Sequence, residues 1–158
     1  PVTPGNRRSK SVISNWENEK MSTREVVQTY MDKMNSGDFL GAFQMFAADG
    51  AYTIIGDTPV SGTYVGPDHI TTSLVPLLEK RFVAPPVVVC TEIIVEGDRG
   101  VALGHGEGPA KFGQYRQRNY AFVFRIRDGK VAELIEFMDP TQLSVNCFGQ
   151  SLSEVVPA

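Results

Sequence analysis

The pattern of apolar and polar positions predicts helices in the first part of the chain. Apolar side chains recur at helical spacing from Val26 to Met34, as they do on one face of a helix. Ser22 and Glu25 stand just before this run with the spacing of a capping box. Gly37 follows the run, at a position where helices commonly end. We therefore expect a first helix between Ser22 and Gly37.

Two further helices are expected. Asp38 can cap the second helix, whose apolar face includes Phe46 and whose end we place at residues 48–50. Pro67 suits the first turn of a third helix. Pro76 lies inside the apolar pattern of that helix, and it predicts a kink or an early end because proline lacks the backbone N–H.

The other patterned segments predict strands, with Asp128-Gly129 as a strong hairpin turn. The expected strands cover residues 51–55, 60–65, 87–96, 101–108, 118–127 and 131–139. Helices followed by a meander of strands indicate the α+β class, with a curved antiparallel sheet and helices packed on one face. A sheet of this shape leaves a concave pocket under the helices, and such pockets are the default ligand sites.

Length and composition agree with a single folded domain. The chain has 158 residues, of which 42% are hydrophobic and 21% are charged, and these values are ordinary for globular proteins. We place the domain at residues 21–140, after a flexible leader at 1–20 and before a C-terminal tail at 141–158. The alternative for the leader is a short segment at residues 12–16 that docks Trp16 on the domain or on a second subunit.

Charge and cysteine content narrow the classes of function. The net charge of −3 gives no basic field to attract nucleic acid or an anionic membrane. No apolar run reaches the roughly 18 residues of a membrane span. Cys90 and Cys147 are too few for a disulfide scaffold, so we expect reduced thiols in a cytoplasmic protein. The sequence shows no phosphate-binding glycine loop, metal-ligand pattern or nucleophile elbow, and we expect no metal or cofactor.

The strand at residues 101–108 carries the first candidate chemistry. Alternation places Leu103, His105 and Glu107 on one face, with alanine and glycine on the other. An imidazole and a carboxylate two positions apart on one face can share a partner, and histidine transfers protons near neutral pH. The alternative is that His105 and Glu107 lie solvated at the rim of the sheet.

The strand at residues 131–139 carries the second candidate for chemistry, a glutamate. Glu136 is the only charged residue on its face, among Ala132, Leu134 and Met138. An ionised carboxylate in apolar surroundings is costly, so Glu136 either meets His105 or an arginine, or has a raised pKa. The alternative is a structural acid with satisfied partners. We expect Asp139 to bond backbone at the strand end or to face a dimer partner.

At this point the chain resembles a known family. The segments NSGDF, FAADGAY, SGTYVGPDHI and YAFVFRIRDGKVAELIEFMD are similar to those of the nuclear transport factor 2-like superfamily. The resemblance is closer to its SnoaL-like branch, which includes polyketide cyclases, limonene-epoxide hydrolase and ketosteroid-isomerase-related proteins. It covers about Ser22–Asp139. It implies a cone-shaped, curved antiparallel sheet with three helices on its concave face, the cystatin-like α+β barrel. It also implies small hydrophobic ligands and a homodimer through the outer face of the sheet.

The resemblance carries specific residues. Glu136 matches the catalytic aspartate that SnoaL-like cyclases place after the last hairpin, and His105 and Glu107 match an arginine–aspartate pair of the epoxide hydrolase. Tyr52 matches a tyrosine that holds water in that hydrolase, but the water-holding asparagine is replaced by Ile54. The general base of ketosteroid isomerase falls near Ile55, which cannot act as a base.

Our first hypothesis is a cofactor-free acid/base enzyme, of cyclase or isomerase type, acting on a small polyketide-, terpenoid- or steroid-like molecule. Glu136 is the principal acid/base, His105 relays the proton, Glu107 orients His105, and Tyr52 donates a hydrogen bond. The residues expected to contact the substrate are Leu103, Leu134, Met138, Ile54 and Phe43. The alternatives are an epoxide hydrolase, a non-catalytic module that binds a hydrophobic ligand, and a partner-binding domain whose pocket is filled by side chains.

Overall fold

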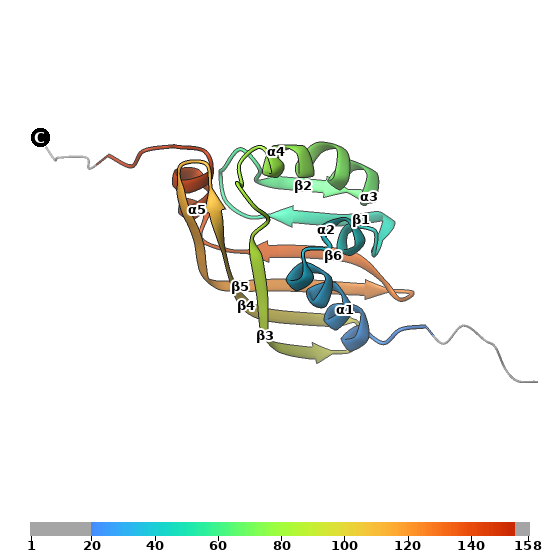
Figure 1. Ribbon diagram of the computed structural model, residues 1–158. Helices are drawn as coiled ribbons and strands as arrows, with labels where there is room; N and C mark the ends of the chain where they lie inside the picture. The colour runs from blue at the N-terminus through green and yellow to red at the C-terminus, as the bar shows by residue number, and fades with distance from the viewer. Residues whose placement is uncertain (1–19, 154–158) are drawn as a thin grey trace, which may run out of the picture.

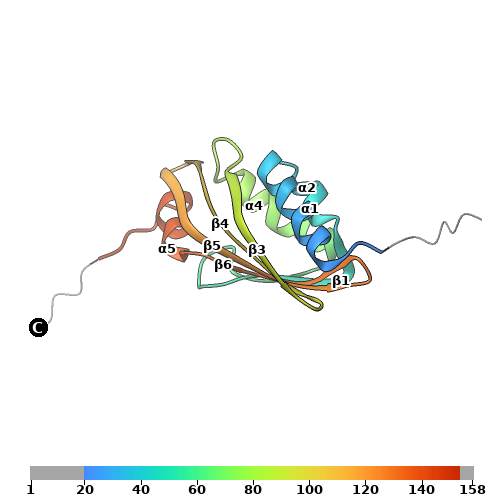
Figure 2. The same cartoon turned by 90° about the horizontal axis from the view of Figure 1, so that it is seen from below.

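Six strands form one bent sheet, and the helices of the N-terminal half lie across its concave face (Figures 1 and 2). The computed structural model describes residues 20–153, so most of the leader, including Trp16, lies outside the described residues. The strand order is β2-β1-β6-β5-β4-β3. The strands are β1 (Phe46–Ile54), β2 (Gly62–Val65), β3 (Val87–Glu96), β4 (Arg99–Ala110), β5 (Gly113–Arg127) and β6 (Lys130–Phe137). The predicted α+β class and curved sheet are confirmed.

One pair of strands departs from the antiparallel arrangement. β1 and β6 run parallel, whereas the other neighbouring strands are antiparallel. β1 and β6 are far apart in the sequence, so no hairpin dictates their relative direction. Their pairing places the two strands side by side, with β2 beyond β1 and β5 beyond β6 (Figure 1).

The first helix forms as its sequence predicts. α1 (Thr23–Ser36) begins at a capping box in which Ser22 and Glu25 bond each other's backbone N–H groups, and it ends at Gly37 with φ of 81°. A positive φ suits glycine because it has no Cβ. The apolar stripe of α1 is buried against the sheet. α1 therefore forms one wall of the space above the sheet.

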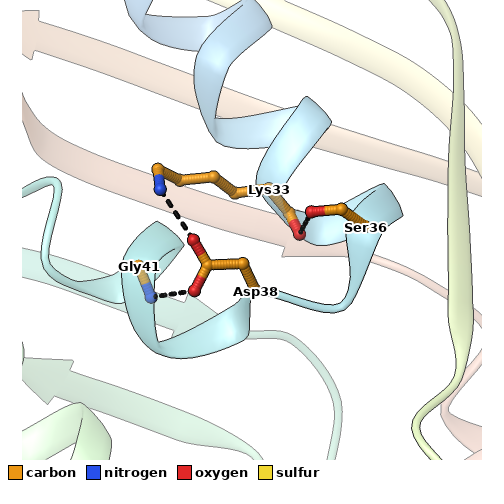
Figure 3. A network of polar contacts seen from close by, with 4 residues as sticks. All are labelled: Lys33, Ser36, Asp38 and Gly41. Carbon is orange, nitrogen blue, oxygen red and sulfur yellow. Dashed lines mark hydrogen bonds and ion pairs between the residues drawn. The ribbon is translucent and has the colours of Figure 1, made fainter.

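A polar network fixes the turn from α1 into α2 (Phe39–Phe43) (Figure 3). Asp38 accepts the Gly41 N–H at 2.9 Å and the Lys33 ammonium at 2.7 Å. Ser36 donates its hydroxyl to the Lys33 carbonyl at 3.0 Å. α2 is shorter than expected, because Phe46 leaves the helical stripe and pairs in β1 with Val131 of β6. A phenylalanine three residues after Phe43 fits either pattern, and the parallel ladder decides between them.

Residues 66–79 are helical, and Pro76 changes the winding of the helix. The segment consists of α3 (Gly66–His69), a π-helical stretch η1 (Ile70–Leu74) and α4 (Val75–Glu79). Pro76 lies near the start of α4. A proline ring collides with the carbonyl four residues earlier in a regular helix, and a π turn widens the helix at that point. The expected kink thus takes the form of a π-helical segment.

The C-terminal residues differ from the expected tail. α5 (Pro140–Gln142) and a π-helical segment η2 (Leu143–Cys147) fold back at the curled end of the sheet (Figure 2). Asp139 caps α5 by accepting the Thr141 N–H at 2.9 Å, which is the backbone role expected for it. Leu143 and Cys147 are buried. No helix among residues 20–153 is long and apolar enough to cross a membrane.

Candidate functional site

A cavity of about 520 Å³ lies between the helices and the concave face of the sheet. Its walls come from the α1–α2 turn, α4, the segment that follows α4, and the inner faces of β1, β5 and β6, and Leu143 of η2 closes one side. Most of the lining side chains are aliphatic or aromatic. A cavity of this size and composition suits a small hydrophobic molecule.

The carboxyl group of Glu136 lies in this cavity and is held by Tyr52. The parallel register pairs Ile54 with Glu136 and Tyr52 with Leu134, so all four side chains point to the same face of the sheet. The Tyr52 hydroxyl donates a hydrogen bond to Oε2 of Glu136. Tyr52 is 3% exposed and Glu136 is 8% exposed. The sequence prediction that Glu136 is a lone acid on an apolar face is confirmed.

Burial sets the protonation of this pair. Loss of hydration raises the pKa of Glu136 from 4.5 to about 7, although the hydrogen bond from Tyr52 lowers it. Burial, together with the nearby Glu136 charge, raises the pKa of Tyr52 well above its usual value. Glu136 is therefore present as both acid and base near neutral pH, which is the condition for proton transfer in both directions. Tyr52 keeps its proton throughout that range.

His105 and Glu107 do not reach the cavity. Both side chains are exposed, and Glu107 pairs with Arg116 of β5 at 3.1 Å in the same exposed setting. The expected relay from Glu107 through His105 to Glu136 is wrong. Alternation correctly places the two residues on one face of β4, but that face is the outer one, because Ala102 and the glycines point inward. Their exposure matches the alternative of solvated residues.

Three of the five residues predicted to contact the substrate line the cavity, and two do not. Phe43, Ile54 and Met138 line the cavity. Leu134 is fully buried on the same face as Glu136, but it is not part of the lining. Leu103 shares the outer face of β4 with His105, so its predicted contact with a substrate in the cavity is wrong.

Two further tyrosines, which the sequence did not single out as site residues, line the cavity. The hydroxyls of Tyr115 and Tyr120 lie 2.5 Å apart, and both residues are almost fully buried. Burial raises the pKa of each, and the charge of Glu136 raises it further, after Tyr115 in the case of Tyr120. The sequence feature that could have pointed to Tyr120 is the glycine-rich face of β4. A Cβ on Gly106 would lie 2.9 Å from the Tyr120 ring. Those glycines make room for the aromatic ring.

Other polar groups near the cavity serve the backbone. The Gln117 side chain donates to the Asp139 carbonyl at 2.8 Å and accepts the Asp139 N–H at 2.9 Å, which joins β5 to the end of β6. Within residues 20–153, no group of three His, Cys, Asp or Glu side chains is placed to hold a metal ion. Three carboxyl groups line the cavity, but Asp38 and Glu79 are exposed at its edge. The buried chemistry that the described residues offer there is therefore that of the Glu136 carboxyl group and the phenols of Tyr52, Tyr115 and Tyr120.

Comparison with known families agrees with this architecture. The profile of the SnoaL-like domain matches residues 27–134. The chain belongs to the SnoaL-like domain family. This family lies within the nuclear transport factor 2-like superfamily, and the sequence-based resemblance to it is confirmed. None of the curated proteins matches the chain.

Several solved structures share the fold. A nuclear transport factor 2-like protein of unknown function from Burkholderia pseudomallei superimposes with a TM-score of 0.69 at 19% identity, over 80% of this chain and 98% of that one. TerC, co-crystallised with polyporic acid, superimposes with a TM-score of 0.66 at 18% identity, over 80% of this chain and 98% of TerC. A phenazine biosynthesis-related protein from Pseudomonas aeruginosa superimposes with a TM-score of 0.67 at 21% identity, over 85% of this chain and 90% of that protein. Identities at this level establish the shared fold alone.

Proposed function

We propose that this SnoaL-like protein is an enzyme that moves a proton on a small hydrophobic substrate, with Glu136 as the acid and base. The observation that carries the proposal is the Glu136 carboxyl group, buried in an apolar cavity with a pKa of about 7 and bonded to Tyr52. A group whose pKa lies near the working pH is present in the form that takes a proton and in the form that returns it.

The reaction class follows from what a single buried carboxyl group can do. Ionised Glu136 takes a proton from an acidic carbon of the substrate, and the electron pair of the broken C–H bond stays on the substrate. Protonated Glu136 returns that proton to a different carbon, which gives an isomerisation. Alternatively, the substrate carbanion attacks a carbonyl carbon of the same molecule, and the C=O π electron pair moves onto that oxygen. Protonated Glu136 then gives its proton to the resulting alkoxide, which completes a cyclisation. The Tyr52 hydroxyl holds the carboxyl group in position in both cases.

Epoxide hydrolysis has less support in this cavity. The hydrolase-like arrangement requires groups at positions 105 and 107 to reach the acid at 136, and both side chains are exposed on the outer face of the sheet. Isomerisation or cyclisation requires only the groups that line the cavity. Two of the fold relatives support a small-molecule ligand, because one is crystallised with polyporic acid and one is linked to phenazine biosynthesis.

Hydrogen–deuterium exchange tests the proposal without knowledge of the net reaction. A panel of bicyclic and tricyclic ketones and lactones is incubated in D₂O with the protein, and exchange of the acidic C–H positions is followed by NMR. We expect catalysed exchange on at least one member, and we expect Glu136→Gln to slow it by about 100-fold or more. The matched control is Glu107→Gln, the same change at an exposed carboxylate, which should leave the rate unchanged.

Equal exchange rates for the native protein and Glu136→Gln would refute the proposal. Binding of panel members with no exchange on any of them would favour the non-catalytic binding module. The homodimer and the cytoplasmic location stay predictions from the sequence.

A further inference from the structure

The Tyr115–Tyr120 pair holds one more hydroxyl proton than its surroundings accept. Each phenol carries one proton, and the single hydrogen bond between the two oxygens uses only one of these protons. Among residues 20–153, no side-chain or backbone group accepts the other. The Gln117 amide donates to the Asp139 carbonyl and accepts the Asp139 N–H, and it accepts no hydrogen bond from either phenol. Both tyrosines line the cavity, so, among the described residues, the remaining proton has no acceptor and can be donated to a molecule in the cavity.

A bulge in the sheet brings these two phenols together. Residues five apart in a regular strand point to opposite faces. The β4–β5 register pairs Gly104 with Tyr120 but Gly106 with Gln117, so Arg118 and Asn119 together oppose one residue of β4. The extra residue turns Tyr120 to the face that Tyr115 and Gln117 already occupy. Bulges of this kind commonly re-aim side chains beside active sites.

The packing around the pair fixes both rings. The Tyr120 ring stacks on Phe122 with centroids 4.9 Å apart, and it lies against Gly106, where any side chain would collide with it. The Tyr115 ring packs edge-on against Phe82 at 5.2 Å. Two fixed rings keep the hydroxyls in place before a ligand arrives, which is the condition for strong hydrogen bonding to a charge that develops on a ligand.

We infer that the Tyr115–Tyr120 pair is the subsite that binds a carbonyl oxygen of the substrate. This inference rests on the proposed function, and it makes the substrate class apolar ketones with an acidic C–H next to the carbonyl. When Glu136 takes that proton, the electron pair moves onto the carbonyl oxygen, which becomes an enolate oxygen. The spare phenol proton donates a hydrogen bond to this oxygen, and the second phenol strengthens that donor by bonding to it. Burial raises the pKa of both phenols, so they donate without losing their protons.

A pair of probes that differ only in the oxygen tests the subsite. 2-Acetonaphthone has a carbonyl that can only accept a hydrogen bond, and 2-ethylnaphthalene has nearly the same shape without it. Binding of both to the full chain is measured at about pH 8.5, where Glu136, with a pKa of about 7, is ionised and cannot donate a hydrogen bond to the ketone. We expect the native protein to prefer the ketone by about tenfold, as one buried hydrogen bond allows.

Substitutions then locate the donor. Tyr115→Phe and Tyr120→Phe each leave one phenol with a free proton, so each should keep most of the preference, whereas the double variant should lose it. Tyr30→Phe is the matched control, because Tyr30 is a fully buried tyrosine outside the cavity lining whose hydroxyl has no partner among the described residues. A preference that is unchanged in the double variant, or absent from the native protein, would overturn the inference.

A second measurement covers the case in which the double variant does not fold. The infrared C=O stretch of carbonyl-¹³C-labelled 2-acetonaphthone, bound to the native protein, should lie below its frequency in an aprotic solvent. A frequency equal to the aprotic value would overturn the inference. Neither readout depends on turnover, so failure of this subsite is separate from failure of the proposed catalysis. Glu136-dependent exchange without ketone preference would refute only the subsite, and ketone preference without exchange would refute only the catalysis.

Discussion

Replacing Glu136 with glutamine should make the stability of the protein less dependent on pH. The glutamine side chain would keep nearly the same shape and could still accept the Tyr52 hydrogen bond, but it cannot ionise. In the native protein the pKa of this carboxyl group is raised from 4.5 to about 7 by burial. Between these two values the folded state binds more protons than the unfolded state, so native stability falls as the pH rises. Above about pH 7 the full loss of stability from ionising buried Glu136 is present, and below about pH 4.5 this loss is absent.

The size of the effect follows from the shift. The rise from 4.5 to about 7 corresponds to about 3 kcal/mol at roughly 1.4 kcal/mol per pKa unit. Glu136 is 8% exposed, so screening by solvent removes little of this. For a domain of this size, about 3 kcal/mol shifts the melting temperature by roughly 10 °C.

Thermal unfolding at several pH values measures the effect. We expect the melting temperature of Glu136→Gln, relative to the native protein, to rise by roughly 10 °C between about pH 5 and about pH 8. Glu107→Gln serves as the control, because this carboxylate is exposed and its replacement should leave the two curves parallel. Parallel curves for Glu136→Gln would show that the carboxyl group ionises in the folded protein as it does in water, and the acid/base argument would fail with it.

Two further predictions concern the Tyr52 hydrogen bond and the contact between β4 and β3. Tyr52→Phe removes the hydrogen bond that lowers the pKa of Glu136, so that pKa should rise above about 7, and ¹³C NMR titration of the Glu136 carboxyl carbon should show it; an unchanged midpoint would contradict the role of Tyr52. Gly104→Ala should destabilise the protein by at least about 1–3 kcal/mol in denaturant unfolding, because the new Cβ would lie 2.1 Å from the Val89 carbonyl oxygen; native-like stability would mean that β3 yields easily.

Local chemistry in the sequence was enough to predict much of the fold. The capping box at Ser22 and Glu25 and the turn at Gly37 define α1 as predicted, because these signals act through neighbouring residues. The Asp128-Gly129 turn joins β5 to β6 with Asp128 at φ of 54°. Phe46 was assigned to the wrong element, because its pairing with Val131 lies far away in the sequence. The Leu143–Cys147 segment was missed because its burial depends on the curled end of the sheet.

The residue pattern alone was enough to identify Glu136 as a lone acid on an apolar strand face, and to place His105 and Glu107 on one face of their strand. Which of the two faces looks inward depends on how the strands and helices pack. Alternation fixes the relation between neighbours in one strand but not the side on which the helices pack. The choice here depends on contacts between distant residues, namely the Tyr120 ring over Gly106 and the Tyr52 hydroxyl on Glu136. The same reason explains the Tyr115–Tyr120 pair, because a one-residue bulge in the sheet pairing reverses the face that strict alternation assigns.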